Sequence, residues 1–488
     1  MTPACRSVVL CACLVLPGCY ALHSSEGGGQ TREPGAREVN PADVALPAGY
    51  RIDAVATGLT FPTGVAFDDA GVPHVVESGY SYGEVWTTAR LLRLETDGSL
   101  TELATGENGP WNGLAFHEGA FYIAEGGQKE GGRILRVGPE GRVQVVVDGL
   151  PSLGDHHTNG PAIGPDGFIY FGQGTATNAG VVGKDNADFG WLARHPEFHD
   201  VPAFDVTLAG RNFTGPDAIG GSGSDVTTGA FLPYGTPSEP GQVIRGNKRC
   251  TGAVLRVAPS GSGLEVVAWG LRNPFGLAFD EAGRLFVTEN SYDERGSRPV
   301  WGTGDVLWEV DVAGPPAWYG WPDFHADQAL TDPDRYAPRG GEPQPGFLLA
   351  EHPGTPPAPA AVFGVHASAN GLDFSTSDAF GHRGEAFVAQ FGDMSPPVGK
   401  VMGPVGFKVV RVEPASGVVE EFAVNRSGQG PASKVGGGGL ERPVAVRFSP
   451  GGEALYVVDF GILTSSEQGH SPREGTGVLW RITRGETP

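Results

Sequence analysis

The sequence has few basic residues, few methionines and almost no cysteine outside its first nineteen positions. Lys and Arg number 34 against 56 Asp and Glu, so the formal net charge is −22 at pH 7. A nucleic-acid-binding protein needs a basic surface to neutralise phosphates, so this composition argues against nucleic acid as a partner. Only Cys250 lies in the part that we expect to fold, which excludes an intrachain disulfide there and is typical of a small buried residue.

Charged residues make up only 18% of the chain, whereas glycine (78) and proline (41) are abundant. Both residues destabilise helix interiors, so the composition argues against a mainly helical protein. Many short strands joined by turns accommodate these two residues well. The sequence therefore predicts an all-β fold.

The first nineteen residues have the features of a targeting segment. Arg6 supplies a basic residue, and residues 8–16 form an apolar run that is too short to span a bilayer. The run ends in Leu-Pro-Gly-Cys, which resembles a bacterial lipobox and implies cleavage before Cys19 and lipidation of its sulfur. A plain secretory signal peptide is the alternative. We expect an exported lipoprotein, periplasmic or cell-surface, anchored by lipid alone, with residues 20–45 as a flexible linker.

A repeated pattern runs along the rest of the chain. Each repeat is a short apolar strand, a turn, a second apolar strand and a polar residue, and the repeats begin at Phe61, Trp111, Asn159, Asn273, Ala369 and Arg442. Such units cannot bury both faces alone, but six of them packed radially cover one another. We therefore predict a six-bladed β-propeller over residues 46–485, with loop insertions at 177–250 and 312–362. A stacked solenoid is the alternative, which the uneven repeat spacing disfavours.

Polar residues recur where the chain leads into the first strand of each repeat. In a propeller these positions meet at one mouth of the central channel, and a packed core would not use such residue types. We expect a polar funnel formed by Asn112, Asp155, His156, His157, Asn159, Arg272, Asn273, His366, Asn370 and Arg442. A second polar set ends the second strands, and we interpret most of it as structural: Glu77, Glu125, Gln173, Glu289, Gln390 and Asp459.

The adjacent histidines His156 and His157 are the best candidates for chemistry within this funnel. Histidine has the side-chain pKa closest to neutrality, so it suits proton abstraction. Asp155 precedes the pair and either orients an imidazole or turns the backbone. A hydrogen-bonded structural role at a strand end is the alternative for both histidines.

Three motifs together resemble the glucose/sorbosone dehydrogenase family: GLPSLGDHHTNGPAIGPDGFIY, GLRNPFGLAFDEAGRLFVTEN and WYGWPDF. Its members are exported six-bladed propellers that oxidise sugars with pyrroloquinoline quinone (PQQ) and calcium. The resemblance implies an aldose sugar dehydrogenase-like oxidoreductase that acts on the CH–OH group of a sugar or similar alcohol. It would pass hydride to the quinone and electrons to an external acceptor, with the protein orienting the cofactor.

The resemblance also implies roles for individual residues. The general base of the family corresponds to His156, with His157 as its catalytic neighbour, and Arg272 would stabilise negative charge on a quinone oxygen. The cofactor-binding positions correspond to Asn273, Arg442 and Thr175. The calcium site of the family uses two backbone carbonyls, which correspond to Ser291 and Tyr292.

The sequence departs from the family pattern at several of these positions. A lysine, an arginine and an aspartate common in the family correspond here to Gly392, Val444 and Ala445. Arginine and lysine are the groups that neutralise the carboxylates of the quinone. Two other functions therefore stay open: a non-catalytic propeller that binds a carbohydrate or protein, and a calcium-dependent lactonase or hydrolase with ligands Glu77, Glu289 and Asp459.

Overall fold

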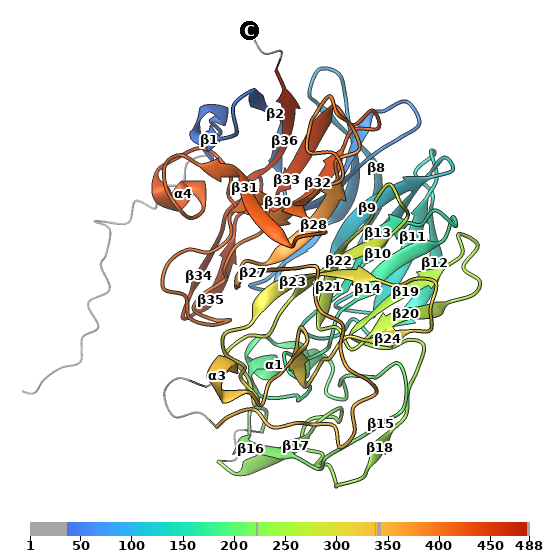
Figure 1. Cartoon of the computed structure of the whole chain (residues 1–488), viewed down its shortest axis with the longest axis vertical. Helices are drawn as coiled ribbons and strands as arrows, with labels where there is room; N and C mark the ends of the chain where they lie inside the picture. Colours follow the sequence, from blue (N-terminus) through green and yellow to red (C-terminus); the bar gives the residue numbers. More distant parts are fainter. Residues whose placement is uncertain (1–36, 221–222, 337, 339–342, 486–488) are drawn as a thin grey trace, which may run out of the picture. The chain divides into compact units, whose positions relative to one another are not determined.

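The computed structural model describes residues 37–220, 223–336, 338 and 343–485. Within these ranges, six sheets of four or five strands hold the six predicted repeats, one repeat in each sheet. Figure 1 shows these sheets with a few short helices beside them. The prediction of an all-β, six-bladed propeller is confirmed.

The first three blades are described from the central channel outward. Blade 1 contains β3 (Pro62–Phe67), β4 (Pro73–Glu77), β7 (Ala89–Leu94) and β8 (Leu100–Gly106). Blade 2 contains β9 (Trp111–His117), β10 (Ala120–Glu125), β11 (Gly132–Val137) and β12 (Val143–Leu150). Blade 3 contains β13 (Thr158–Ile163), β14 (Ile169–Gln173), β19 (Ala253–Val257), β20 (Glu265–Trp269) and the parallel edge strand β24 (Ala317–Trp318).

The other three blades follow the same order. Blade 4 contains β21 (Asn273–Phe279), β22 (Leu285–Asn290), β23 (Gly304–Val310) and β27 (Ala361–Val365). Blade 5 contains β28 (Ala369–Phe374), β29 (Ala386–Gln390), β30 (Lys408–Glu413), β31 (Val418–Asn425) and β1 (Val44–Ala45). Blade 6 contains β32 (Pro443–Phe448), β33 (Ala454–Asp459), β36 (Gly477–Arg484) and β2 (Tyr50–Leu59).

The ring is closed by strands from the two ends of the described chain. The outermost strand of blade 6, β2, comes before blade 1 in the sequence, and it pairs antiparallel with β36 at the other end. The innermost strands contact one another in a cycle, β3, β9, β13, β21, β28, β32 and again β3. Sheet closure of this kind leaves only short edges exposed.

The core consists of apolar layers between neighbouring blades. One such cluster packs Val76 and Leu91 of blade 1 against Trp111, Ile123 and Leu135 of blade 2, and all five side chains are buried. The central strands are continuously apolar because both of their faces are covered, as in β10, where every residue is buried. Apolar contacts between neighbouring blades therefore hold the ring together, as the repeat predicts.

The second polar set joins parts of the same blade. The Glu77 carboxylate accepts a hydrogen bond from the backbone N–H of Thr60 at 2.7 Å, and the Asp459 carboxylate accepts one from Arg442 N–H at 2.9 Å. Glu289 accepts in the same way from the backbone N–H of Arg272. The interpretation of these acids as structural is confirmed, because each one fixes the segment that leads into the innermost strand.

Residues 37–45, within the predicted linker, contact the ring. Arg37 Nη2 donates to the Asp459 carboxylate and to the Gly439 carbonyl, both at 2.6 Å. The 3-10 helix η1 (Pro41–Asp43) follows, and β1 then pairs with β31. The sequence did not show this because the segment is polar and its partners lie some four hundred residues away. Residues 1–36, with Cys19 and the predicted signal peptide, lie outside the described residues.

The two predicted insertions carry the remaining elements. They pair with each other through a bridge between Leu208 and Leu349, and Figure 1 shows them beyond the same end of the sheets. The insertions contain α1 (Lys184–Asp188), α2 (Trp191–Arg194), β15 (Val206–Thr207), β16 (Asn212–Pro216), β17 (Asp225–Gly229), β18 (Val243–Ile244), β25 (Phe324–His325), β26 (Gln328–Ala329) and α3 (Pro333–Tyr336). Outside them lie two short hairpins and one short helix: β5 (Tyr80–Ser81) with β6 (Val85–Trp86), β34 (Leu463–Ser466) with β35 (Gly469–Pro472), and α4 (Ala432–Val435).

No helix in the described part of the chain is long and apolar enough to cross a membrane. Cys250 is fully buried and free, as predicted, and burial raises the pKa of its thiol to about 12.

Candidate active site

The polar positions that were predicted to converge line two adjoining cavities at one end of the channel. The outer compartment, about 110 Å³, is lined by residues that include Asp155, His156, Arg272, Asn273 and His366. The inner compartment, about 100 Å³, is lined by residues that include Asn112, His156, His157, Asn159, Asn273 and Asn370. Since His156 and Asn273 line both compartments, we call the two together the funnel cavity.

His156 lies in the loop that leads into β13. Its Nδ1 is 3.0 Å from both the carbonyl oxygen and the hydroxyl oxygen of Thr175. That hydroxyl donates to the carbonyl of Thr177, so both Thr175 oxygens act as acceptors and Nδ1 carries the proton. Nε2 then keeps its lone pair on the opposite side of the ring. Burial, together with the guanidinium groups of Arg272 and Arg295, holds the pKa of His156 well below its ordinary value, so the ring is neutral.

His157 differs from its neighbour because its ring nitrogen is already engaged. The side-chain amide of Gln128 donates to Nε2 of His157 at 2.7 Å and to the carbonyl of Gly154 at 2.6 Å. Burial lowers the pKa of His157 to about 4. The structure therefore brings both histidines to the funnel cavity but leaves only His156 with a free nitrogen lone pair.

A cluster of buried ion pairs surrounds His156. Asp155 forms an ion pair with Arg295, and its Oδ2 lies 3.6 Å from Nε2 of His156 and 3.9 Å from Nη2 of Arg272. The Asp293 Oδ2 atom accepts from Arg272 at 2.8 Å and from Arg295 at 3.0 Å. Both guanidinium groups are therefore matched by carboxylates of the protein.

Sequence reasoning identified Asp155 and Arg272 in this cluster but missed Asp293, Arg295 and Asp185. Asp293 and Arg295 belong to the stretch SYDERGSR after β22, whose density of charge was a usable signal in a chain with so few charged residues. Asp185 pairs with Arg295 at 2.7 Å from α1 of the insertion, and nothing in its sequence context marks it.

His366 belongs to the outer compartment and is paired with acids. Its Nε2 is 2.8 Å from the Glu294 carboxylate, and its Nδ1 is 3.6 Å from Asp293. Burial lowers the pKa of His366, but the Glu294 hydrogen bond and the Asp293 charge outweigh burial, so the net pKa is raised. The protonated form of His366 is thus favoured, in contrast to His156.

A chain of asparagine amides crosses four positions of the funnel wall. Asn112 donates to Asn159 at 3.1 Å, Asn159 donates to Asn273 at 3.0 Å, and Asn273 donates to Asn290 at 2.9 Å. Three of these residues occupy equivalent positions in successive blades, as the repeat predicts. The predicted cofactor-binding residue Asn273 is thereby held at the cavity wall by neighbours on both sides.

Aromatic residues from the first insertion and from the β34–β35 hairpin line the outer compartment. Phe189 stacks on Trp191 with ring centroids 4.7 Å apart, and His470 of the β34–β35 hairpin lies parallel to Phe189 at 6.1 Å. Trp191 is 1% exposed and His470 is 8% exposed, and Trp191 Nε1 and His470 Nε2 have no hydrogen-bond partner among the described residues. Both side chains line the cavity. The wall of the outer compartment therefore contains two polar nitrogens that no described residue satisfies.

Arg442 is placed away from the funnel cavity, although it was predicted to line it. Its Nη1 donates to the carbonyls of Gly392 and Asp393 at 3.1 Å, and its Nε donates to the Leu463 carbonyl at 3.0 Å. The guanidinium thereby lines a larger neighbouring cavity, which we call the side cavity. The tertiary arrangement of the loop after β29 decides this, because that loop passes between Arg442 and the channel.

Both predicted calcium positions take part in hydrogen bonds within the protein, Tyr292 through its carbonyl and Ser291 through its N–H. The Tyr292 carbonyl accepts from the Thr303 hydroxyl at 3.0 Å, and the backbone N–H of Ser291 donates to Asp305 at 2.9 Å. No group of three His, Cys, Asp or Glu side chains that could hold a metal is found among the residues that the structure describes. Thr175 contacts His156 and not the cavity, so it acts on the site through that ring.

Comparison with protein-family models finds no match, and comparison with curated protein sequences finds none either. Solved structures do match. The calcium structure of the Trichoderma reesei carbohydrate-active enzyme of family AA12 is 16% identical, covers 93% of this chain and 100% of that chain, and has a TM-score of 0.53. The holo PQQ domain of pyranose dehydrogenase from Coprinopsis cinerea is 17% identical, with 92% and 99% covered and a TM-score of 0.53.

A third match is the apo form of the soluble aldose sugar dehydrogenase from Escherichia coli, 14% identical, with 89% and 99% covered and a TM-score of 0.51. Identities this low indicate a common fold rather than a common activity. The expected resemblance therefore holds at the level of architecture: this chain is a six-bladed propeller with the fold of sugar dehydrogenases that include PQQ-binding members.

Proposed function

We propose that the funnel cavity is the active site of an oxidoreductase that acts on a hydroxyl group of a small sugar or similar alcohol, with His156 as the general base. The observation that carries this proposal is a neutral His156 whose Nδ1–H is fixed on Thr175. A base for a hydroxyl proton must be unprotonated, oriented and at the cavity, and His156 meets all three conditions.

The surrounding residues suit transient proton storage on His156. Once Nε2 has taken a proton, the Asp155 carboxylate at 3.6 Å stabilises the new charge. The guanidinium groups of Arg272 and Arg295 oppose it, so the ring returns to its neutral form after each transfer. Thr175 keeps the ring plane fixed throughout, because its carbonyl holds Nδ1–H in both states.

The cavity is suited to one small polar molecule. Its compartments of about 110 and 100 Å³ fall below the volumes of about 300–1,000 Å³ that are usual for drug-sized ligands. Asn273 and Asn290 bring amide groups to the lining, and Trp191 lines the same outer compartment. This pattern of donors and acceptors is complementary to a molecule with several hydroxyl groups.

PQQ, when bound, would supply the hydride acceptor that oxidation of an alcohol requires, but the residues present do not fit it in the funnel cavity. Its carboxylates need unpaired cations, whereas Arg272 and Arg295 are matched by Asp155 and Asp293, and Arg442 lines the side cavity. Of the two predicted calcium ligands, the Tyr292 carbonyl already accepts from the Thr303 hydroxyl. The proposed oxidation therefore requires a diffusible two-electron acceptor, which would take the hydride from the alcohol carbon while His156 takes the hydroxyl proton.

The same pairing of charges favours a second candidate function, a non-redox propeller that binds a small carbohydrate in the funnel cavity. Binding requires the unpartnered nitrogens of Trp191 and His470 but no cofactor. The carboxylates considered for a calcium-dependent hydrolase, Glu77, Glu289 and Asp459, each hold together their own blade, so the third function has no support here.

We also propose that the mature protein is exported and lipid-anchored through Cys19, on the strength of the leader sequence. Incorporation of labelled palmitate into the expressed full-length chain, and its loss in Cys19→Ser, is the expected result. A chain that is secreted without lipid contradicts the anchor and leaves the plain signal peptide.

One experiment separates the two functions of the funnel cavity. The purified protein is titrated calorimetrically with a panel of aldoses and polyols, and sugar-dependent dye reduction is then measured with and without added PQQ and Ca²⁺. Dye reduction that His156→Asn abolishes, while sugar binding persists, supports the oxidoreductase. Sugar binding without dye reduction under either condition identifies the binding protein. No sugar binding at millimolar concentration contradicts both.

A further inference from the structure

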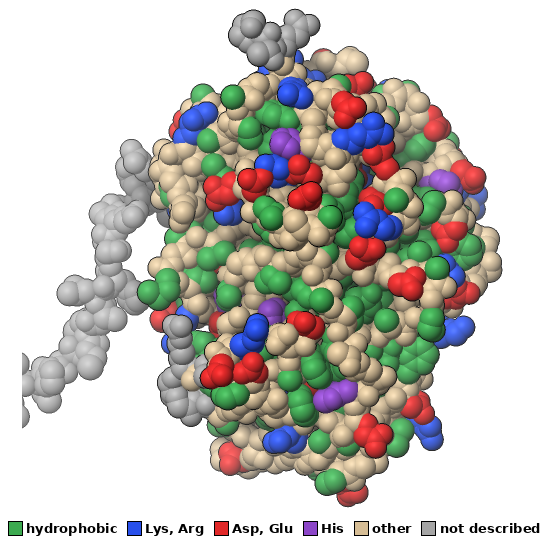
Figure 2. Space-filling model, viewed as in Figure 1, with side chains coloured by type: hydrophobic (Ala, Val, Ile, Leu, Met, Phe, Trp, Pro, Cys, Tyr) green, Lys and Arg blue, Asp and Glu red, His purple; other side chains and the backbone are tan. Residues whose placement is uncertain are grey.

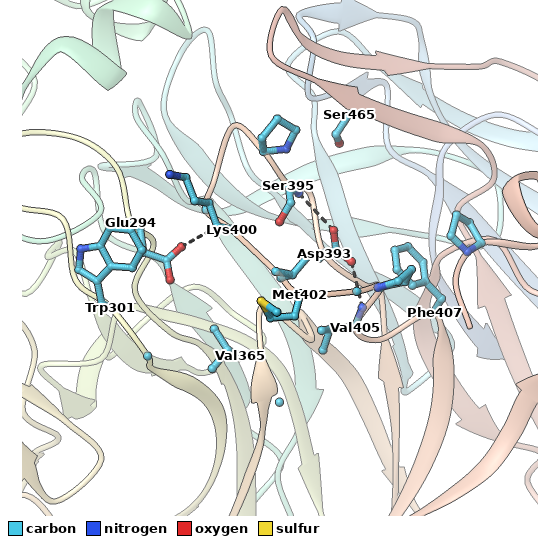
Figure 3. A pocket seen from close by; sticks show the side chains of 18 of the residues that line it. Glu294, Trp301, Val365, Asp393, Ser395, Lys400, Met402, Val405, Phe407 and Ser465 are labelled. Carbon is cyan, nitrogen blue, oxygen red and sulfur yellow. Dashed lines mark hydrogen bonds between the residues drawn. The ribbon is translucent and has the colours of Figure 1, made fainter. Parts of the chain in front are cut away.

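The side cavity is a hollow for which the proposed function gives no role. Its volume is about 1,040 Å³, and it shares no lining residue with the outer compartment of the funnel cavity. The loop after β29 separates the two, since Met394 and Val398 line the outer compartment whereas Ser395 and Gly399 line the side cavity. Figure 3 shows this cavity, with Glu294 and Trp301 on one side and Phe407 on the other.

The charge of the side cavity differs from that of the molecule as a whole, whose acidic side chains are scattered over the face shown in Figure 2. The chain carries a formal charge of −22, yet the cavity is lined by two acids, Glu294 and Asp393, and four cations, Arg335, Lys400, Lys434 and Arg442. The acids are engaged by the loop itself: Glu294 accepts from the backbone N–H of Lys400 at 3.2 Å, and Asp393 accepts from Val405 N–H at 3.0 Å (Figure 3).

Arg442 is the strongest single indication of a ligand. The residue is 2% exposed, and no described carboxylate lies within ion-pair distance of its guanidinium, although the charge of Asp393 acts on it from further away. Nε and Nη1 donate to backbone carbonyls, and the rings of Phe391 and Phe407 lie 4.9 and 5.0 Å from the guanidinium carbon. Nη2 donates to no described residue. A buried cation without an anionic partner is costly, so an anion in the adjoining cavity would be bound favourably.

Two further lining residues carry polar atoms without partners. Trp301 Nε1 and Ser395 Oγ are buried and have no hydrogen-bond partner in the described part of the chain, and both residues line the cavity. Lys400 and Lys434 are exposed at its rim, and neither forms an ion pair in the part of the chain that the structure describes. Most of the remaining lining is apolar, namely Val365, Pro396, Val401, Met402, Pro404, Val405 and Phe407.

We propose that the side cavity is a binding site for an organic acid, a molecule with an apolar body and a carboxylate that Arg442 and the two lysines recognise. The apolar lining takes the body of the ligand, and the cationic and N–H donors take its carboxylate. This site is separate from the funnel cavity and does not depend on the function proposed there.

Octanoate is the probe, and 1-octanol is its neutral counterpart with the same chain. Calorimetric titration of the purified full-length protein is expected to show saturable binding of octanoate, weaker binding in high salt and much weaker binding of octanol. Removing both rim lysines in Lys400→Ala/Lys434→Ala is expected to weaken octanoate binding at least about tenfold, since charge-assisted hydrogen bonds are lost.

Two further variants test whether binding depends on this cavity. Lys248→Ala removes one positive charge from another exposed position and should leave octanoate binding unchanged. Trp301→Phe tests the cavity without changing any charge and should weaken binding. Equal binding of octanol and octanoate, equal binding of inorganic phosphate and octanoate, or an unchanged affinity in the lysine variant each contradicts a carboxylate site here.

Discussion

Nδ1 of the His156 imidazole lies 3.0 Å from the backbone carbonyl oxygen of Thr175. A carbonyl can only accept, so this contact determines which ring nitrogen carries the proton. The free lone pair is then on Nε2, next to the funnel cavity and to Asp155. In His157, one residue later, the Nε2 lone pair is not free, because the Gln128 amide donates to it.

We expect His156→Asn to reduce turnover of whichever sugar is oxidised by about 10²–10⁴-fold, the usual contribution of a general base. His157→Gln should retain most of the turnover, since Nε2 of His157 is already engaged by Gln128. Initial rates of dye reduction at saturating sugar measure both effects, with circular dichroism as the check on folding. Equal losses in the two variants would show that the tautomer argument is wrong.

The rate of turnover should also stay level as the pH is lowered from about 8 to about 6. An unperturbed histidine base would be half protonated at about 6.5, but burial, Arg272 and Arg295 keep the pKa of His156 well below that value. The measurement is the pH profile of kcat. An acid limb centred near 6.5 would indicate a base other than His156.

Burial of His157 predicts a pH-dependent stability. Its pKa is about 4 in the folded chain and about 6.5 when unfolded, so the unfolded state binds the proton more strongly between these values. The stabilisation is fully present above pH 6.5 and is lost as the pH falls toward 4. Relative to His157→Gln, wild type should therefore lose up to about 3 kcal/mol of unfolding free energy from pH 7 to 4.

Urea denaturation of both proteins at matched pH measures this difference. The comparison with a variant is needed because buried acids titrate in the same range with the opposite sign. Burial raises the pKa of Glu289 to about 7 and that of Asp200 to about 6, and both are common to the two proteins. A wild-type advantage that stays constant with pH would contradict the prediction.

Arg37→Ala should destabilise the ring, because Arg37 joins the start of the folded unit to Asp459 of blade 6. The Arg37 and Asp459 side chains are 3% and 0% exposed, and breaking such a buried pair costs about 3 kcal/mol. Arg51→Ala removes an exposed arginine from neighbouring strand β2 and should cost no more than about 0.5 kcal/mol. Thermal unfolding distinguishes them, and similar midpoints would place the folded boundary nearer the predicted residue 45.

Trp191→Phe should weaken sugar binding severalfold without loss of stability. The indole Nε1 has no hydrogen-bond partner among the described residues, so the substitution breaks no described bond, and a ligand that reaches Nε1 from the outer compartment would lose a hydrogen bond worth about 1 kcal/mol. Trp308→Phe is the matched control, because Trp308 Nε1 donates to Glu289 at 2.5 Å. That substitution should lower stability and leave sugar affinity unchanged. Calorimetric titration and chemical denaturation of both variants test the contrast.

The sequence by itself determined the repeat, and through it the architecture. Apolar strands separated by glycine-rich turns recur six times, and such units must cover one another because none can bury both faces alone. The same repeat placed Asn112, Asn159 and Asn273 at equivalent positions, which is why their meeting at one cavity could be foreseen.

Only the tertiary structure decided the chemistry of the cavity. The ion pairs of Asp155 and Arg272 involve Arg295 and Asp293, and Trp191 and His470 reach the cavity from a loop insertion and a distant hairpin. Arg442 has the predicted position in the repeat, yet the loop after β29 passes between it and the channel. Repetition fixes where the backbone of each blade begins, whereas the partners of a side chain depend on non-repeated loops that fold back over the ring.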